Sequence, residues 1–299
     1  MRIAVTGSSG LIGSAIVNAM QLRGDEVVRV VRPNSRSKGV LWDPAAGQID
    51  RAGLEGINGV VHLAGEPILG VWTRSHKRRI LQSRVQGTRL IAETMATLDS
   101  RPLVLASASG INYYGNRPGP EAIDETATRG SGFLADVVEA WESAAAPAAQ
   151  AGIRVANLRT GLVLAKGDGT LKFAVPAFYM GLGGRLGNGK QIWSWVAIDD
   201  VVGSYLHVLD TNISGPVNVV APNPVSNAEF TRVLADVLHR PAFMAVPEAV
   251  LRLGGDLVDE LILSGARIVP RKLVESGYRF RHSDLRAALQ AVLAGQVAT

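Results

Sequence analysis

The sequence predicts an α/β protein built on a parallel sheet, and three observations support that prediction. Strand-like and helix-like segments alternate from the first residue, a glycine-rich turn joins the first strand to the first helix, and 47% of the 299 residues are hydrophobic. Strands that are separated by helices pair in parallel through crossover connections, which leave helices on both faces of the sheet. We therefore expect a doubly wound sheet.

The predicted elements follow in order along the chain. The segment RIAVT, residues 2–6, is typical of a buried strand, and apolar residues at helical spacing over 11–23 indicate the first helix. The segment VVRVV at 27–31 predicts the second strand. Further strands are expected at 59–64, 103–106 and 155–158, with helices near 77–95 and 134–151.

The pattern changes after about Gly161. A glycine-rich loop occupies 181–191, a strand is expected at 216–220, and a helix at 227–239 begins at a Ser226 or Asn227 N-cap. From 247 on, aliphatic residues recur at helical spacing. We predict a main domain over 1–215, in which 161–215 contribute to a substrate pocket, and a smaller, mostly helical C-terminal lobe over 216–299.

Composition excludes several classes of function. There is no cysteine and the five histidines are scattered, which argues against disulfides, thiolate chemistry and a zinc site, so no metal is predicted. The net charge is +5, but the basic cluster at 74–79 fits a solvated helix face, so no nucleic acid is predicted. The N-terminus resembles no leader, and no apolar run reaches roughly 18 to 20 residues. We expect a cytoplasmic protein with no membrane partner.

The first turn carries the clearest motif, TGSSGLIG at 6–13. Glycines are needed at a tight turn, where backbone approaches a pyrophosphate, and where helix meets strand, while the helix N-terminus supplies amide donors. A tight turn that needs glycine for its geometry alone is the alternative. We predict a Rossmann-type dinucleotide site formed by Thr6, Gly7, Ser9, Gly10, Leu11, Ile12 and Gly13.

The end of the second strand favours NADP(H) over NAD(H). An acidic residue there would bind a ribose 2′-hydroxyl, whereas this chain has VRPNSR at 31–36. Arg32 can clamp a phosphate, and Ser35 and Arg36 add donors. The alternative is that Arg32 is an exposed arginine at a strand end.

Several motifs resemble those of one family. The TGxxGxxG spacing, HLAG at 62–65 and SASGINYYG at 107–115 resemble the extended short-chain dehydrogenase/reductases. The segments LAGEPI, SRVQGT, RTGLVL, GGRLGNGKQIWSWVAIDD and RPAFMAVP sharpen this to the atypical "epimerase family" branch, which has its own C-terminal domain. The resemblance implies NADP(H) binding, with Leu63, Ala64 and Gly65 beside the nicotinamide, and a substrate that is generally unassigned. Some plant and cyanobacterial relatives are linked to plastid or cell division.

The resemblance fails at the catalytic pair. In typical members a serine and a Tyr-x-x-x-Lys motif on the next helix carry the acid–base chemistry. Here the two motif positions fall at Phe133 and Val137, or one residue later at Leu134 and Val138. Neither register supplies an acid, a base or a cation, so we predict a helix that packs against the sheet.

Other polar residues could replace the missing pair. Ser109 lies where the family serine is expected, and the phenols of Tyr113 and Tyr114 follow in a short loop. These three are the predicted catalytic residues, Tyr114 being the first choice among the phenols because it aligns with a pocket tyrosine of extended members. The alternative for both phenols is a structural role, with one packed inward.

Three further residues are predicted to line a substrate pocket: Glu66, Arg185 and Gln191. Glu66 is a candidate proton carrier if burial raises its pKa, against a loop-fixing role. Arg185 and Gln191 belong to a glycine-rich segment that resembles the pocket-covering loop of extended members.

The sequence is consistent with two functions, one of an enzyme and one of a regulatory protein. The first is an NADP(H)-dependent oxidoreductase or epimerase-like enzyme that acts on an unidentified small carbonyl or hydroxyl compound. The second is a non-catalytic NADP(H)-sensing regulatory protein, with division as one setting. The predicted partner is a small-molecule substrate, and a homodimer is compatible with the sequence.

Overall fold

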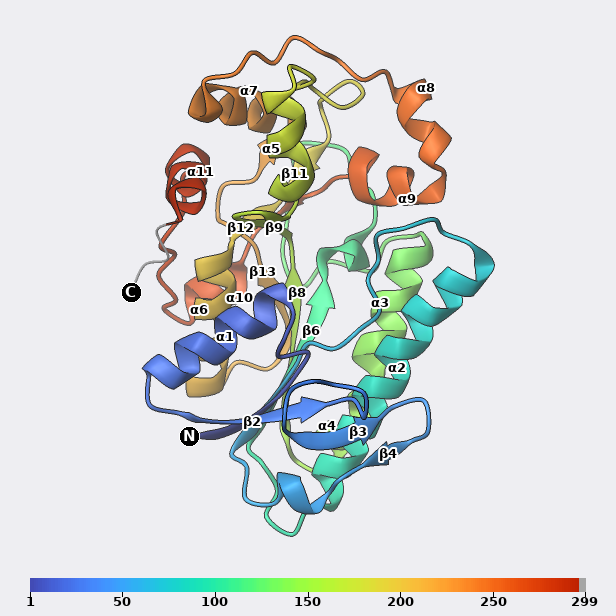
Figure 1. Ribbon diagram of the computed structural model, residues 1–299, viewed down its shortest axis with the longest axis vertical. Coiled ribbons are helices and arrows are strands. Elements are labelled where there is room, and N and C mark those ends of the chain that lie inside the picture. The colour runs from blue at the N-terminus through green and yellow to red at the C-terminus, as the bar shows by residue number, and fades with distance from the viewer. Residues whose placement is uncertain (296–299) are drawn as a thin grey trace. The chain divides into compact units, whose positions relative to one another are not determined.

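A computed structural model of the chain describes residues 1–295 (Figure 1). The chain divides into two compact units, and each is built from separate stretches of sequence. The first unit comprises 1–110, 136–159 and 202–217, and the second comprises 111–135, 160–201 and the chain from 218 on. The chain therefore passes between the units several times.

The first unit is organised by an eight-stranded sheet in the order β13-β8-β6-β5-β1-β2-β3-β4. The pairs β1–β2, β1–β5, β5–β6 and β2–β3 are parallel, and only the edge pair β3–β4 is described as antiparallel. The strands are β1 (Arg2–Thr6), β2 (Glu26–Val31), β3 (Val40–Asp43), β4 (Gln48–Ile49), β5 (Gly59–His62), β6 (Val104–Gly110), β8 (Arg154–Thr160) and β13 (Gly215–Val219).

Helices cover both faces of this sheet, as parallel crossovers require. In Figure 1, α1 (Leu11–Leu22) and α6 (Ile198–Asp210) lie on one face, and α2 (Arg74–Thr97) and α3 (Phe133–Ser143) lie on the other. The short α4 (Ala146–Gln150) packs against α2. One apolar core joins the sheet to α2 and α4, and its fully buried members include Ala4, Val60, Ile91, Met95, Leu105 and Ala148.

The second unit contains three small sheets, ordered β10-β9-β12, β11-β14 and β15-β7. Its core includes Trp195, Phe178, Phe230, Leu234 and Leu289. The strands are β7 (Ala122–Ile123), β9 (Leu162–Ala165), β10 (Asp168–Gly169), β11 (Ile192–Trp193), β12 (Trp195–Ala197), β14 (Val225–Ser226) and β15 (Arg267–Ile268).

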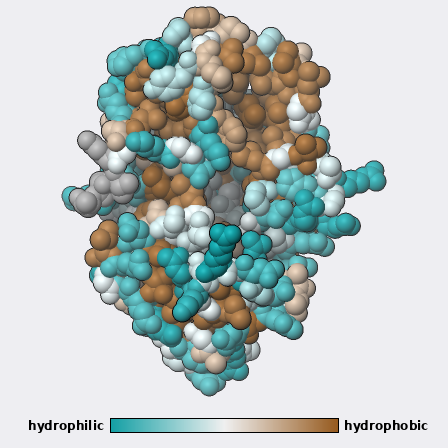
Figure 2. All heavy atoms as spheres, viewed as in Figure 1, coloured by the Kyte–Doolittle hydropathy of each residue, from teal (hydrophilic) through white to brown (hydrophobic). Residues whose placement is uncertain are grey.

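Short helices complete the second unit. They are α5 (Leu171–Tyr179), α7 (Asn227–Leu238), α8 (Glu248–Leu251), α9 (Asp256–Val258), α10 (Arg271–Glu275) and α11 (Leu285–Ala294), with a π-helical turn at Asp259–Leu263 and a 3-10 turn at Ile111–Tyr114. Exposed apolar side chains, among them Phe173, Met180 and Leu253, gather on this unit (Figure 2).

The predicted fold class is confirmed, whereas the helix predicted at 134–151 is interrupted. It forms α3 and α4, because Pro147 occupies the first turn of α4 and lacks the amide that a continuous helix needs. Residues 111–135 and 160–201, which the sequence analysis placed in the main domain, cluster with the C-terminal segments instead. Over 1–295 no helix has the length and apolar character to cross a membrane.

Candidate functional site

The phosphate loop joins β1 to α1 in a conformation that depends on glycine. Gly7 has a positive φ of 64°, and a Cβ there would lie 3.0 Å from the Ala64 nitrogen. At Gly13 a Cβ would lie 2.1 Å from the Gly7 oxygen, which no side chain can tolerate. Gly10 caps α1 without a side-chain hydrogen bond, so the first amides of the helix are available to an anion. The loop therefore has the shape and donors of a dinucleotide cradle.

A buried network fixes the opposite wall of this cradle. The Thr6 hydroxyl accepts hydrogen bonds from the amides of Leu63 (3.0 Å) and Ala64 (3.2 Å) and lies 2.8 Å from His62 Nδ1. Because the amides must donate, the single hydroxyl proton goes to Nδ1, and the imidazole proton resides on Nε2. That buried Nε2 has no hydrogen-bond partner in the described part of the chain. Burial lowers the pKa of His62 to about 4, so the ring is neutral.

The turn after β2 holds the residues predicted to choose the cofactor. Arg32, Ser35 and Arg36 are exposed, and the Ser35 amide donates to the Arg32 carbonyl at 2.9 Å. Ser35 Oγ accepts from the Ser37 amide and keeps its proton for another acceptor. Arg29, which the sequence analysis missed, donates to the Ser8 carbonyl in the phosphate loop at 3.3 Å. The sequence feature that could have identified Arg29 is its charge within the otherwise apolar segment VVRVV.

Ser109 belongs to a buried polar cluster at the end of β6. Its hydroxyl donates to Glu142 Oε1 at 2.6 Å, and Arg159 holds the same carboxylate through Nε (2.8 Å) and Nη2 (2.7 Å). The side chains of Arg159 and Glu142 are 4% and 13% exposed. A bidentate pair of this kind fixes the carboxylate and leaves the serine oxygen with free lone pairs. Sequence reasoning missed this partnership, since Glu142 lies on α3 and Arg159 on β8.

The helix that should carry Tyr-x-x-x-Lys is a packing helix, as predicted. Leu134, Val137, Val138 and Trp141 are at most 8% exposed and form its inner face. The two positions of either register therefore contribute only apolar surface. The acid–base chemistry of typical family members has no source at these positions.

Glu66 lies on the loop that follows β5, and Arg84 on α2 contacts it. The Glu66 carboxylate pairs with Arg79 at 3.2 Å and does not line either described pocket, which favours the loop-fixing role over that of proton carrier. Arg84 is buried, donates to the Glu66 carbonyl at 2.9 Å and stacks its guanidinium 5.0 Å from the Trp141 ring. Burial lowers the pKa of Arg84 to about 10, which still leaves it charged at neutral pH. The sequence analysis missed this buried cation.

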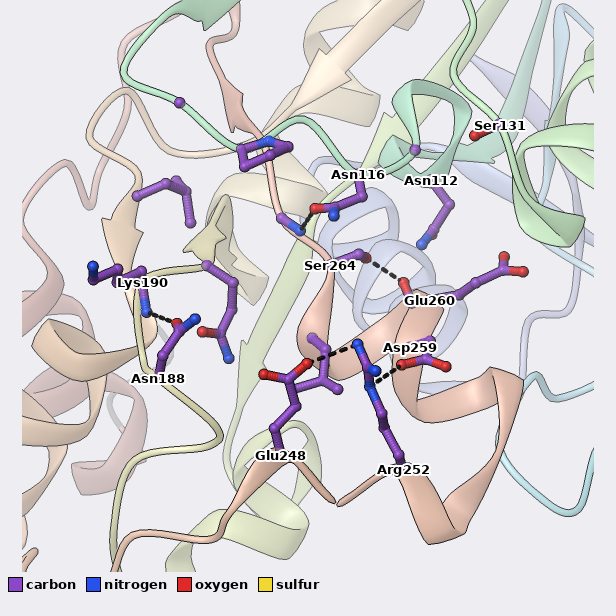
Figure 3. Close-up of a pocket in the computed structure, with 17 residues that line it drawn as sticks. Asn112, Asn116, Ser131, Asn188, Lys190, Glu248, Arg252, Asp259, Glu260 and Ser264 are labelled. Carbon is purple, nitrogen blue, oxygen red and sulfur yellow. Dashed lines mark hydrogen bonds and ion pairs between the residues drawn. The ribbon is translucent and has the colours of Figure 1, made fainter. Parts of the chain in front are cut away.

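The second unit contains the larger pocket, of about 740 Å³. Figure 3 shows its polar lining, which comes from the loop after the 111–114 turn, from the glycine-rich loop and from the C-terminal helical segments. Gln191 lines this pocket, whereas Arg185 is exposed and is not among the lining residues. The charged and amide residues that line it are Asn112, Asn116, Asn188, Lys190, Gln191, Glu248, Arg252, Asp259 and Glu260.

The two tyrosines do not line this pocket. Tyr114 is fully buried, and its hydroxyl donates to Asn218 Oδ1 at 2.7 Å. Tyr113 packs edge-on against Tyr114 with ring centroids 5.4 Å apart. The structure thus gives Tyr114 the structural role that the sequence analysis held as the alternative, because its phenol is committed to a buried hydrogen bond. Asn112, just before them, lines the pocket instead.

The fold and the glycine cradle define a class: a short-chain dehydrogenase-like protein with a nucleotide-binding fold and a second unit. Residues 3–221 match the model of the NAD dependent epimerase/dehydratase family, and residues 246–292 match a domain of unknown function, DUF1731. The chain belongs to the NAD dependent epimerase/dehydratase family, and within it is similar to the epimerase family proteins.

Two relatives show the extent of the similarity. An epimerase family protein of Mycobacterium bovis is 37% identical over 291 residues, covering 96% of both chains. The human epimerase family protein SDR39U1 is 31% identical over 98% of this chain and all of its own.

Two solved structures agree with these relatives. The crystal structure of human SDR39U1 (isoform 2) with NADPH matches 98% of this chain and 99% of its own, with a TM-score of 0.88 and 32% identity. A nucleoside-diphosphate sugar epimerase from Corynebacterium glutamicum matches 98% of this chain and 58% of its own, with a TM-score of 0.80 and 35% identity.

Proposed function

We propose that this chain is an NADP(H)-dependent oxidoreductase or epimerase-like enzyme that acts on a small carbonyl or hydroxyl compound without a Tyr–Lys pair. The observation that carries the proposal is the phosphate loop, in which Gly13 leaves no room even for a Cβ. A close approach of backbone to backbone below an uncapped helix is the geometry that a pyrophosphate cradle requires. The NADPH in the crystal structure of human SDR39U1 supports the same cofactor.

Different residues of the first unit are proposed to bind different parts of the cofactor. The amides at the start of α1 would bind the pyrophosphate, and the 63–65 backbone would contact the nicotinamide end. Arg32, Ser35 and Arg36 would bind the 2′-phosphate through charge-assisted hydrogen bonds. When bound, the cofactor donates or accepts hydride at its nicotinamide ring.

Ser109 is the proposed proton carrier. The Ser109 hydroxyl donates its hydrogen bond to Glu142, with Oγ and Oε1 2.6 Å apart. The lone pairs of the serine oxygen can therefore accept a proton from a substrate hydroxyl. In the direction of alcohol oxidation, that proton moves to Ser109 Oγ while the serine proton moves to Glu142 Oε1. Arg159 orients the carboxylate throughout. The reverse transfers protonate a carbonyl oxygen during reduction.

We expect wild-type protein to bind NADPH more tightly than NADH, and Arg32→Glu to reverse that preference. The substitution removes the cation that faces the 2′-phosphate and adds an acceptor for a ribose 2′-hydroxyl. We expect NADPH affinity to fall by about 10- to 100-fold, as the loss of a charge-assisted hydrogen bond implies. Titration of both cofactors by fluorescence measures the ratio.

The matched control is Arg89→Glu, which makes the same charge change at an exposed position on α2. It should leave the ratio of the two affinities unchanged. Equal affinities of the wild-type protein for NADPH and NADH would remove the assignment to NADP(H).

Turnover is tested separately from binding. Protein loaded with NADPH is mixed with a panel of aldehydes, ketones and quinones, and the NADPH absorbance is followed. We expect decay with at least one compound, and loss of at least 100-fold in rate in Ser109→Ala, in line with removal of a general acid–base group. Unchanged absorbance across the panel would contradict turnover and favour the second function.

The second function is a non-catalytic NADP(H)-sensing protein. The apolar residues at both candidate dyad positions of α3 favour it, together with the commitment of Tyr114 to Asn218. It predicts tight NADPH binding with no oxidation by any substrate.

A further inference from the structure

The pocket of the second unit is built from more acidic than basic groups. Two cations, Lys190 and Arg252, and three carboxylates, Glu248, Asp259 and Glu260, line it. Its formal charge is therefore negative by one unit. Nucleoside diphosphates carry at least two negative charges and are usually held by arginines with free donors.

Arg252 is already paired with two carboxylates, through Nη2 and Nε. It donates to Glu248 at 2.7 Å and lies 3.3 Å from an Asp259 oxygen, so it sits between two carboxylates (Figure 3). A phosphate that approached Arg252 would compete with both acids and then remain beside them. Like charges at such distances repel by about 1 kcal/mol or more even in water. Arg252 therefore offsets part of the acidic charge on this wall of the pocket.

The helix N-terminus at the pocket is also occupied. Glu260 Oε1 accepts from the Phe133 amide at 2.8 Å, and Oε2 accepts from the Leu134 amide at 2.7 Å. These amides open α3 and would otherwise form an anion site. The protein's own carboxylate fills that site, so a substrate phosphate finds no donors there.

Lys190 is the remaining cation of the pocket. It is exposed and lies across the pocket from Glu260 in Figure 3. One solvated ammonium gains little from a diphosphate at physiological salt, since water and ions screen the attraction. It cannot offset the two carboxylate charges that remain after Arg252 is counted.

The uncommitted groups of the pocket are neutral and of both hydrogen-bonding types. Asn116 and Asn188 each use the side-chain oxygen on a backbone amide, which leaves their NH2 groups as donors. Gln191 uses its NH2 group on two carbonyls, which leaves its oxygen as an acceptor. Asn112 and Ser131 engage none of the described residues through their side chains. Mixed donors and acceptors match hydroxyl groups, which both donate and accept.

We infer that the substrate of this pocket is an uncharged, hydroxyl-rich compound, and that the acidic lining excludes nucleoside diphosphates and other phosphorylated ligands. The inference rests on the proposed function only in taking this pocket as the substrate site.

Ligand affinity tests the inference without any turnover. Calorimetry on the NADPH-loaded full chain compares matched probes: glucose 1-phosphate with methyl glucoside, and UDP-glucose with uridine, alongside a panel of neutral polyols and glycosides. We expect one or more neutral probes to bind and each phosphorylated partner to bind at least 10-fold more weakly. In Glu248→Gln/Asp259→Asn, which frees Arg252, we expect affinity for UDP-glucose to rise about 10-fold or more.

The matched control is Glu229→Gln, which removes an acid from the exposed face of α7 and should leave every affinity unchanged. Binding of UDP-glucose to the wild-type chain as tightly as uridine would overturn the inference. So would a double variant that gains no affinity for UDP-glucose, or a panel in which no neutral probe binds. NADPH affinity, measured in the same samples, reports independently on the proposed function.

Discussion

Arg159→Met is expected to lower the free energy of unfolding by about 3 to 5 kcal/mol, the cost of leaving a buried charge without its partner. Arg159 is 3% exposed and is the bidentate partner of Glu142, which also accepts a hydrogen bond from the Ser109 hydroxyl. Without the guanidinium, the carboxylate must stay charged in a dry environment or take up a proton. Equilibrium unfolding in urea, followed by circular dichroism, measures the change.

Two further variants separate the buried charge from simple loss of packing. Arg159→Met/Glu142→Leu removes both charges and should recover part of the lost stability, because apolar groups can replace a buried pair. Arg232→Met breaks an exposed pair at 3.4 Å on α7 and should leave the midpoint unchanged. A double variant less stable than Arg159→Met would contradict the interpretation.

The protein is expected to lose stability as the pH falls from 7 to 5, and His62 is expected to supply about 2 kcal/mol of that loss. Its pKa is about 4 in the folded chain against 6.5 in the unfolded chain. The unfolded state therefore takes up a proton first, and the stabilisation present above pH 6.5 is lost on acidification, reaching about 3 kcal/mol below pH 4. Urea unfolding at a series of pH values measures the slope.

His62→Asn keeps an acceptor for the Thr6 hydroxyl but cannot be protonated. Between pH 7 and 5 we expect this variant to lose about 2 kcal/mol less stability than the wild type. His239→Asn is the control, because His239 is exposed at the left-handed end of α7, where asparagine is well tolerated. Its pH dependence should follow that of the wild type. An unchanged slope in His62→Asn would remove the assignment to this imidazole.

Local patterns were sufficient to predict the fold class. Strand and helix segments of the right length, with glycines at 7, 10 and 13 between the first two, lead to a parallel sheet with helices on both faces. The packing helix at α3 followed from its apolar spacing, and burial of Leu134, Val137 and Val138 confirms it. Such features depend on residues that are close together in the chain, so they can be predicted from the sequence.

The partners of polar groups depended on contacts between distant segments. Ser109 was identified from its place after a strand, but its acceptor Glu142 and the orienting Arg159 lie on two other elements. Tyr114 was the preferred phenol by alignment, yet its hydroxyl belongs to Asn218, over a hundred residues along the chain. Periodicity carries no information about which of two neighbouring tyrosines turns inward.

The sequence by itself determined a nucleotide-binding α/β scaffold with an altered catalytic helix, because glycine geometry and apolar spacing are local properties of the chain. Only the tertiary structure decided which charges neutralise one another. Glu260 caps the helix that begins at Phe133, and Arg252 bridges Glu248 and Asp259. The fold also sets the sign of the pocket's charge by bringing two cations and three carboxylates into one lining, and both effects depend on distance in space rather than on order along the chain.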